Sequence, residues 1–180
     1  MPFYSYGNEV KYKITDLSSV NEKLIEDFSC GIDDIDKVIK NKDAIDCTLK
    51  LVVDEEKEYL IGFIAYQASG IRSCYENAAV TKPALQINYF AIDSHYQHLK
   101  YDDSEDPEDK YNLSDDIFCK FLDMFRDISD KYLYFEYIIL YSVPSAKNFY
   151  VRNFFKEFNA YMSPDNYRYL DGCLPMYMPI

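Results

Sequence analysis

The sequence is poor in side chains that bind metals or build disulfide frameworks. It has two histidines, His95 and His98, and five cysteines without any Cys-x-x-Cys spacing. Structural zinc sites usually need closely spaced pairs of ligands, and an odd number of scattered cysteines does not form a disulfide framework. We therefore expect neither a metal site nor a disulfide framework. The cysteines are Cys30, Cys47, Cys74, Cys119 and Cys173.

Long apolar runs are also missing. No stretch approaches the roughly 20 apolar residues that cross a bilayer. The amino terminus, "MPFYSYGNEVKYK", lacks the basic segment followed by an apolar run that marks a secretory signal. We expect a cytoplasmic protein that makes no membrane contact.

Basic residues are few. The chain has 19 Lys and Arg against 31 Asp and Glu, which gives a formal net charge of −12. Such a charge repels polyphosphates at long range, so nucleic acid is not expected as a partner. Apolar residues make up 48% of the chain, and its 180 residues suit one folded domain over positions 1–180 with a core of its own.

The apolar pattern predicts strands that alternate with helices. Alternation of this kind indicates an α/β or α+β fold around a mixed sheet. The expected strands cover residues 9–17, 47–53, 58–69, 84–93, 134–143 and 173–180, and the expected helices cover 18–28, 33–45, 114–132 and 144–158. The residues expected to cap the first three helices are Ser18 or Ser19, Asp33 or Asp34, and Ser114. Pro175 and Pro179 favour an edge position for the last strand.

Three segments resemble the GNAT superfamily of acetyltransferases. Residues 28–44, "FSCGIDDIDKVIKNKDA", resemble a helical segment found in a subset that includes toxin-type acetyltransferases. Residues 87–93, "INYFAID", resemble the central strand beside the pantetheine arm, and residues 144–158, "PSAKNFYVRNFFKEF", resemble the late helix with its Phe-Tyr pair. The resemblance implies a mixed, mostly antiparallel sheet with about four helices, splayed between its two central strands.

The acidic segment "YQHLKYDDSEDPEDKYNLSDD", residues 96–116, stands where the family has a glycine-rich turn that binds pyrophosphate. It offers Gln97 but no glycine. One interpretation is an insertion at about 100–112, with Gln97 at one end and helix-start N–H groups near Leu113 and Ser114 at the other, all binding coenzyme A. The alternative is a solvated acidic loop, because Asp115 and Asp116 already offset the helix dipole.

The resemblance also assigns cofactor and catalytic residues. Tyr150 would donate a proton to the departing thiolate, since a phenol with a pKa near 10 stays protonated at neutral pH. Main-chain groups of Phe90, Ala91 and Ile92 would bind the pantetheine arm, and Asn148 would bind the arm or its phosphate. The implied cofactor is acetyl-CoA.

The acceptor side is less defined. Cys30, Asn88 and Tyr89 are candidate substrate-binding residues, while Asp93 is expected to cap a turn and no general base stands out. Cys30 is read as a packed small residue because no histidine motif accompanies it. The segment "GIRSCYENAAVTKP", residues 70–83, is expected to contribute to specificity.

Three functions remain open at this point. The first is acetyl-CoA dependent N-acetylation of a small-molecule or protein amine by direct attack, in a family that often forms homodimers. The second is a GNAT-like protein without activity, which binds a basic protein partner through the acidic loop. The third is toxin-type acetylation of aminoacyl-tRNA, which the charge of −12 disfavours.

Overall fold

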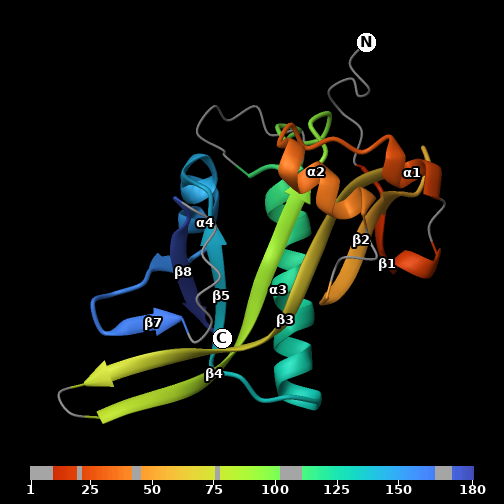
Figure 1. Ribbon diagram of the computed structural model, residues 1–180. Helices are drawn as coiled ribbons and strands as arrows, with labels where there is room; N and C mark the ends of the chain where they lie inside the picture. The colour runs from red at the N-terminus through yellow and green to blue at the C-terminus, as the bar shows by residue number, and fades with distance from the viewer. Residues whose placement is uncertain (1–9, 20–21, 42–45, 76–77, 102–110, 165–171) are drawn as a thin grey trace. The chain divides into compact units, whose positions relative to one another are not determined.

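Most apolar segments form the elements that they predict (Figure 1). The computed structural model describes residues 10–19, 22–41, 46–75, 78–101, 111–164 and 172–180. The strands are β1 (Tyr12–Asp16), β2 (Thr48–Asp54), β3 (Tyr59–Tyr75), β4 (Ala78–Ile92), β5 (Tyr137–Ser142), β6 (Lys156–Glu157), β7 (Met162–Pro164) and β8 (Leu174–Pro179). The α-helices are α1 (Glu22–Glu26), α2 (Asp33–Lys40), α3 (Leu113–Lys131) and α4 (Lys147–Arg152), and 3-10 turns cover Leu17–Ser19 and Pro144–Ala146.

The strands form a mixed sheet with the order β1-β2-β3-β4-β5-β8-β6, and β7 pairs with β3. The pairs β1–β2, β3–β7, β5–β8 and β6–β8 are antiparallel, whereas β4 and β5 are parallel. β4 pairs with β5 over Ala84–Ile87 and then continues to Ile92. The predicted mixed, mostly antiparallel sheet is therefore confirmed, and the described residues contain four α-helices, as expected.

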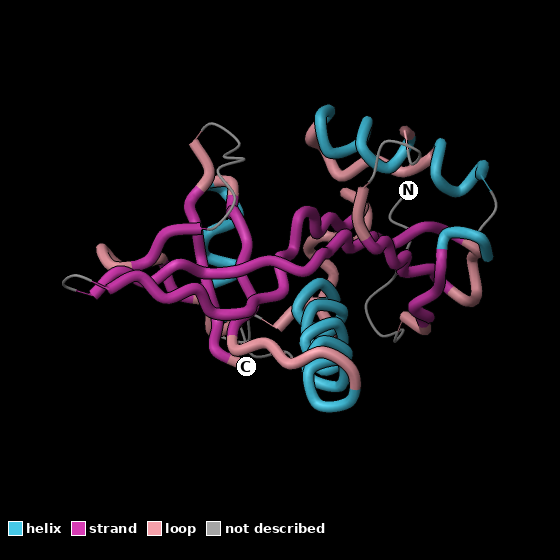
Figure 2. The backbone as a smooth tube through the Cα atoms, turned by 60° about the horizontal axis from the view of Figure 1, so that its bottom comes forward, coloured by secondary structure: helices cyan, strands magenta, loops and turns pink. Residues whose placement is uncertain are grey.

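The chain divides into two compact units, which we describe separately. The first comprises residues 1–65 and 89–120, and the second comprises residues 66–88 and 121–180. In the first unit, Ala91 belongs to an apolar cluster with the α1–α2 region, where Phe28 meets Phe63 edge-on at 5.6 Å between ring centroids. The neighbouring Phe90 instead meets Phe118 of α3 at 4.9 Å. Because successive strand residues point to opposite faces, α2 and the start of α3 cover opposite faces of β4 (Figure 2).

The second unit has its own apolar contacts. Tyr66 of β3 packs against Phe125 in the later part of α3, with ring centroids 4.9 Å apart. Ile71, Ala84 and Ile139 form a buried cluster that brings together β3, β4 and β5. Among the described residues of the whole chain, no helix has the length and apolar character needed to span a membrane.

Several predicted boundaries are wrong. The hairpin of β3 and β4 is longer than expected, because the segment 70–83 continues the two strands to Tyr75 and from Ala78. The first helix is shorter than predicted and follows a 3-10 turn, and α2 ends at Lys40. The last helix ends at Arg152 instead of continuing to position 158.

Two local expectations are also corrected. β8 lies between β5 and β6 and not at the edge, because β6 pairs with Met176 and Tyr177, which lie between its two prolines. The N-cap of α2 is Ile32, so Asp33 and Asp34 lie in the first turn of the helix. There they face the positive end of the helix dipole without capping it.

Candidate functional site

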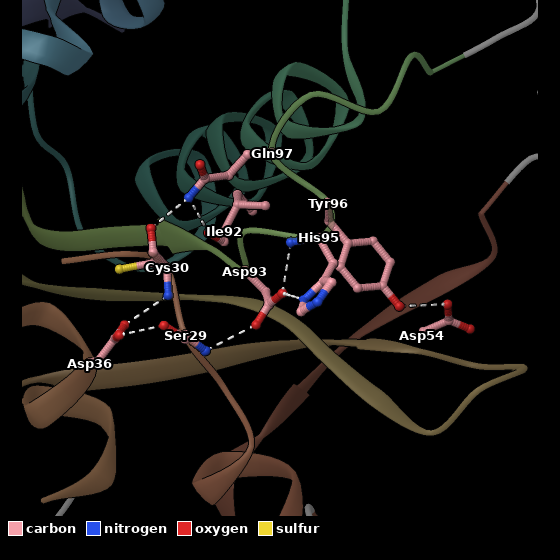
Figure 3. A network of polar contacts seen from close by, with 9 residues as sticks. All are labelled: Ser29, Cys30, Asp36, Asp54, Ile92, Asp93, His95, Tyr96 and Gln97. Atoms are coloured by element: carbon pink, nitrogen blue, oxygen red, sulfur yellow. Dashed lines mark hydrogen bonds and ion pairs between the residues drawn. The ribbon is translucent and has the colours of Figure 1, made fainter. Parts of the chain in front are cut away.

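A network of polar contacts surrounds the end of β4 in the first unit (Figure 3). The side-chain amide of Gln97 donates hydrogen bonds to the carbonyl oxygens of Cys30, at 2.8 Å, and of Ile92, at 2.9 Å. Gln97 therefore joins the last residue of β4 to the loop between α1 and α2. In this position its amide group binds protein carbonyls, whereas the sequence predicted a contact with coenzyme A.

Asp93 makes a second link to the same loop. Its carboxylate accepts hydrogen bonds from the backbone N–H of Ser29, at 3.0 Å, and of His95, at 2.9 Å. It also lies 2.7 Å from Nδ1 of His95, and its side chain is 1% exposed while that of His95 is 49% exposed. Asp93 thus holds the turn that follows β4, and in addition it anchors Ser29.

Asp36 of α2 completes the network from the other side of the loop. It accepts hydrogen bonds from the Cys30 N–H and from the Ser29 hydroxyl, both at 2.8 Å. Burial alone would raise the pKa of Asp36, but the hydrogen bonds from Cys30 and Ser29 outweigh it, so the pKa lies below its usual value. Gly31, with φ of 84°, turns the chain between α1 and α2.

Cys30 is buried, and each of its polar groups is used inside the protein. Its N–H binds Asp36, its carbonyl accepts from Gln97, and its thiol lies 3.9 Å from the carbonyl of Ile32. Burial and the hydrogen bond with Asp36 raise the pKa of the Cys30 thiol to about 12. The thiol therefore stays protonated at neutral pH, which removes the chemistry of a nucleophile.

The backbone groups of the three β4 residues assigned to pantetheine point in different directions. A Cβ placed on Gly62 of β3 would lie 2.5 Å from the carbonyl oxygen of Ala91, so this carbonyl faces β3. By strand alternation, the backbone groups of Phe90 and Ile92 point away from β3. The Ile92 carbonyl accepts a hydrogen bond from Gln97, so it is bonded within the protein.

Asn88 and Tyr89 differ in their surroundings. The side-chain oxygen of Asn88 is buried and has no hydrogen-bond partner among the described residues. A buried acceptor of this kind costs about 1–3 kcal/mol, so it fits a position that a ligand donor completes. Tyr89 is half-buried and packs against the apolar cluster of the first unit.

The start of α3 is largely satisfied by the protein itself. The Leu113 N–H donates to the Leu99 carbonyl at 2.8 Å, and the Asn112 N–H donates to the Asp115 carboxylate at 3.0 Å. The Asn112 carbonyl accepts from the N–H groups of Asp115 and Asp116. Asn112 therefore occupies the N-cap position that was predicted for Ser114, which is buried in the first turn. Most of the acidic insertion, residues 102–110, lies outside the described residues.

In the second unit, α4 presents Tyr150 near its carboxyl end. Tyr150 is buried, and burial together with nearby Cys173 raises the pKa of its phenol above the ordinary value. The phenol therefore remains a proton donor over the physiological pH range. Asn148, two residues earlier on α4, is exposed.

Known proteins resemble this chain in structure but not in sequence. No family model and no curated protein matches its sequence. Its structure is similar to that of a bacterial toxin with a TM-score of 0.72 at 19% identity, over 95% of this chain and 92% of that one. It is also similar to a Tyr-to-Phe mutant of the toxin AtaT, with a TM-score of 0.69 at 12% identity, over 99% of this chain and 95% of that one. AtaT and KacT are GNAT-fold toxins.

The chain has the GNAT fold. A Tyr-to-Phe mutant of KacT agrees, with a TM-score of 0.66 at 13% identity over 96% of this chain and 95% of that one. Within the GNAT fold, sequence reasoning missed the carboxylate of Asp36 and the links made by Asp93 and Gln97. One signal was present, since Asp36 falls on the same helical face as Ile35 and Ile39, where a charged residue must find partners if it is buried.

Proposed function

We propose that the protein is an N-acetyltransferase that moves the acetyl group of acetyl-CoA to a primary amine. The observation that carries the proposal is the buried, protonated phenol of Tyr150 on the late helix of a GNAT fold. AtaT, which shares this fold at 12% identity, was solved with acetyl-CoA bound. Acetyl-CoA would supply an acetyl group activated as a thioester.

The residues of this chain fit the groups that such a reaction requires. The amine would attack the thioester carbonyl, a C–N bond would form, and the C–S bond would break. The Tyr150 hydroxyl would pass its proton to the sulfur that leaves, and solvent would take the proton released by the amine. The side-chain oxygen of Asn88 would accept a hydrogen bond from the bound arm or from the amine, and the backbone of Phe90 would hold the arm as a neighbouring strand would. Asn148, Ile92, Gln97 and Ser114 remain proposed cofactor contacts.

For the acceptor, we favour the amino group of an aminoacyl-tRNA. AtaT was solved in complex with acetyl-methionyl-tRNAfMet, at a TM-score of 0.62 and 14% identity over 95% of both chains. The expectation of no nucleic-acid partner rested on net charge alone. Net charge describes long-range repulsion but does not locate the basic side chains that would meet RNA, so this expectation is set aside here.

The GNAT-like binder without activity is the alternative, and one observation favours it. The N–H groups of Asn112 and Leu113 are bonded within the protein, and two carboxylates occupy the first turn of α3. A pyrophosphate at this helix start would have to replace some of those bonds. The proposed enzyme and this alternative therefore differ most simply in whether acetyl-CoA binds.

The test measures acetyl-CoA binding by calorimetry and acetyl transfer to aminoacyl-tRNA. We expect Tyr150→Phe to lower turnover by about 100-fold or more, because general acid catalysis contributes about 10²–10⁴-fold. The dissociation constant for acetyl-CoA should be unchanged. Tyr177→Phe is the matched control, because this tyrosine packs against Tyr137 and Phe158 in the second unit.

Two results would contradict the proposal. Absence of acetyl-CoA binding at millimolar concentration would favour the inactive binder. Equal turnover in wild type and Tyr150→Phe would remove the role assigned to Tyr150 and leave the proton donor to another group.

A further inference from the structure

The residue that follows α4 combines an unusual backbone with an unusual exposure. Phe154 has a φ of 71°, in the left-handed region, and its aromatic side chain is 77% exposed. A bulky residue in this region is a genuine outlier, and a large apolar side chain gains nothing from facing water. Both features cost stability, which points to a use for this side chain outside the folded chain.

The hydrogen bonds around Phe154 explain why its backbone is left-handed. The Phe154 N–H donates to the Val151 carbonyl at 3.1 Å, and the Phe155 N–H donates to the Tyr150 carbonyl at 3.0 Å. These two bonds define a Schellman motif with Phe154 at the C′ position, which is usually glycine. The motif includes the usual apolar contact, here between the rings of Phe155 and Tyr150 at 5.9 Å. Glycine would satisfy this position with less strain, so phenylalanine is not required by the fold.

Two basic residues stand on either side of Phe154 in the chain. Arg152 and Lys156 are both exposed, while the intervening Asn153 and Phe155 are buried. The guanidinium of Arg152 lies over the ring of Phe149, 4.9 Å from its centroid. An exposed aromatic ring between two cations is the combination by which proteins bind unpaired nucleotides, with the base on the ring and the phosphates near the cations.

We propose that Phe154, Arg152 and Lys156 form a contact site for an unpaired nucleotide at the acceptor end of an RNA. The choice of RNA rests on the proposed function. In acetyl-CoA the whole pantetheine arm separates the adenosine from the thioester. In an aminoacyl-tRNA the reacting amine belongs to an amino acid esterified to the terminal adenosine. Tyr150, which would act at the thioester sulfur, is four residues from Phe154 and in ring contact with its neighbour Phe155. We therefore assign the base on Phe154 to the unpaired end of the RNA that carries the amine.

The experiment uses the whole protein and an RNA hairpin with an unpaired 3′ CCA end, with binding measured by fluorescence anisotropy at a fixed salt concentration. Phe154→Gly should weaken binding about 10-fold, because stacking on an aromatic ring contributes substantially for each base. The same variant should keep or raise the melting temperature, by about 2–4 °C, since glycine suits the C′ position. Phe154→Trp should restore binding. Tyr134→Ala is the matched control, as it removes another exposed aromatic residue of the second unit.

Loss of RNA affinity in Phe154→Gly, with rescue by Phe154→Trp and no effect of Tyr134→Ala, supports the site. No binding of the hairpin to the wild type, or equal binding to wild type and Phe154→Gly, overturns it. Acetyl transfer is measured separately. RNA binding that depends on Phe154, without any acetyl transfer, would therefore contradict the proposed enzyme and support this site. Acetyl transfer that Phe154→Gly leaves unchanged would support the enzyme and contradict this site.

Discussion

The chemistry of Cys30 is decided by its burial and by its contacts with Asp36 and Gln97. A cysteine reacts as a nucleophile only where its thiol is accessible and ionised. Here the Cys30 N–H donates a hydrogen bond to Asp36, and the Cys30 carbonyl accepts one from Gln97. Burial and the contact with Asp36 raise the pKa of the Cys30 thiol to about 12. Cys74, by contrast, is exposed.

This difference predicts the reactivity of the two thiols. In the native protein at pH 8, iodoacetamide should alkylate Cys74 and leave Cys30 unmodified, because the thiolate is the reacting form and Cys30 is both protonated and buried. Peptide mass spectrometry of a time course gives the two rates. After denaturation in urea the two should react alike, which serves as the control. Alkylation of native Cys30 as fast as Cys74 would show that the loop opens readily.

At the scale of elements, the end of β4 depends on its close approach to β3. Gly62 is the residue that allows it, because a Cβ there would lie 2.5 Å from the Ala91 carbonyl oxygen and 2.7 Å from Cδ1 of Ile92. The Ala91 oxygen belongs to the backbone and cannot turn aside as the end of a side chain can. The backbone of β4 that is proposed to hold pantetheine is therefore set by the packing of its neighbour.

Gly62→Ala tests this arrangement. The added methyl group should push β4 aside and lower the free energy of unfolding by about 1–3 kcal/mol, as overpacking usually does. Denaturant unfolding measures that loss, and calorimetry should show weaker acetyl-CoA binding. Gly31→Ala is the comparison, since nothing lies within 4 Å of its Cβ and its cost of about 1 kcal/mol comes from the positive φ alone. Equal effects of both variants on acetyl-CoA affinity would argue against a special role for this contact.

At the scale of the whole molecule, the fold raises the pKa of one cysteine and several tyrosine side chains. Burial is the first cause of a raised pKa for Cys30, Tyr12, Tyr111 and Tyr150, and the carboxylate of Asp116 adds to the effect at Tyr12. The folded state therefore binds more protons than the unfolded chain once the pH exceeds the ordinary pKa of these groups, which is 9.0 for cysteine and 10.0 for tyrosine. Their contribution to stability is complete below pH 9 and is lost as the pH rises.

We accordingly expect the free energy of unfolding to fall steeply above pH 9. Urea unfolding at pH 7, 9 and 10.5 measures the trend. Tyr150→Phe should show a shallower decline than the wild type, because it removes one of the groups whose pKa the fold raises. A stability that stays constant to pH 10.5 would show that these phenols and the thiol ionise without cost to the fold.

The sequence by itself determined the elements whose signal is local. The apolar stripe of α3 is periodic over five turns, and β5 is a short apolar run, so both were predicted within a few residues. The resemblance of three segments then indicated the GNAT fold. The sequence could not predict where α4 ends, because the phenylalanine at its C′ position is not a helix stop signal as glycine is.

Tertiary structure decided the contacts between residues that are distant in the chain. Gln97 reaches the Cys30 carbonyl across 67 positions, Asp93 reaches Ser29 across 64, and Tyr12 donates to Asp116 across 104. The partner of a polar side chain is set only when the sheet has brought distant segments together. A buried amide or carboxylate then bonds to the nearest donors and acceptors, because a buried polar group without a partner lowers stability. For this reason the sequence could indicate that Gln97 and Asp93 lie near the end of β4. Only the fold showed that both bind the loop between α1 and α2.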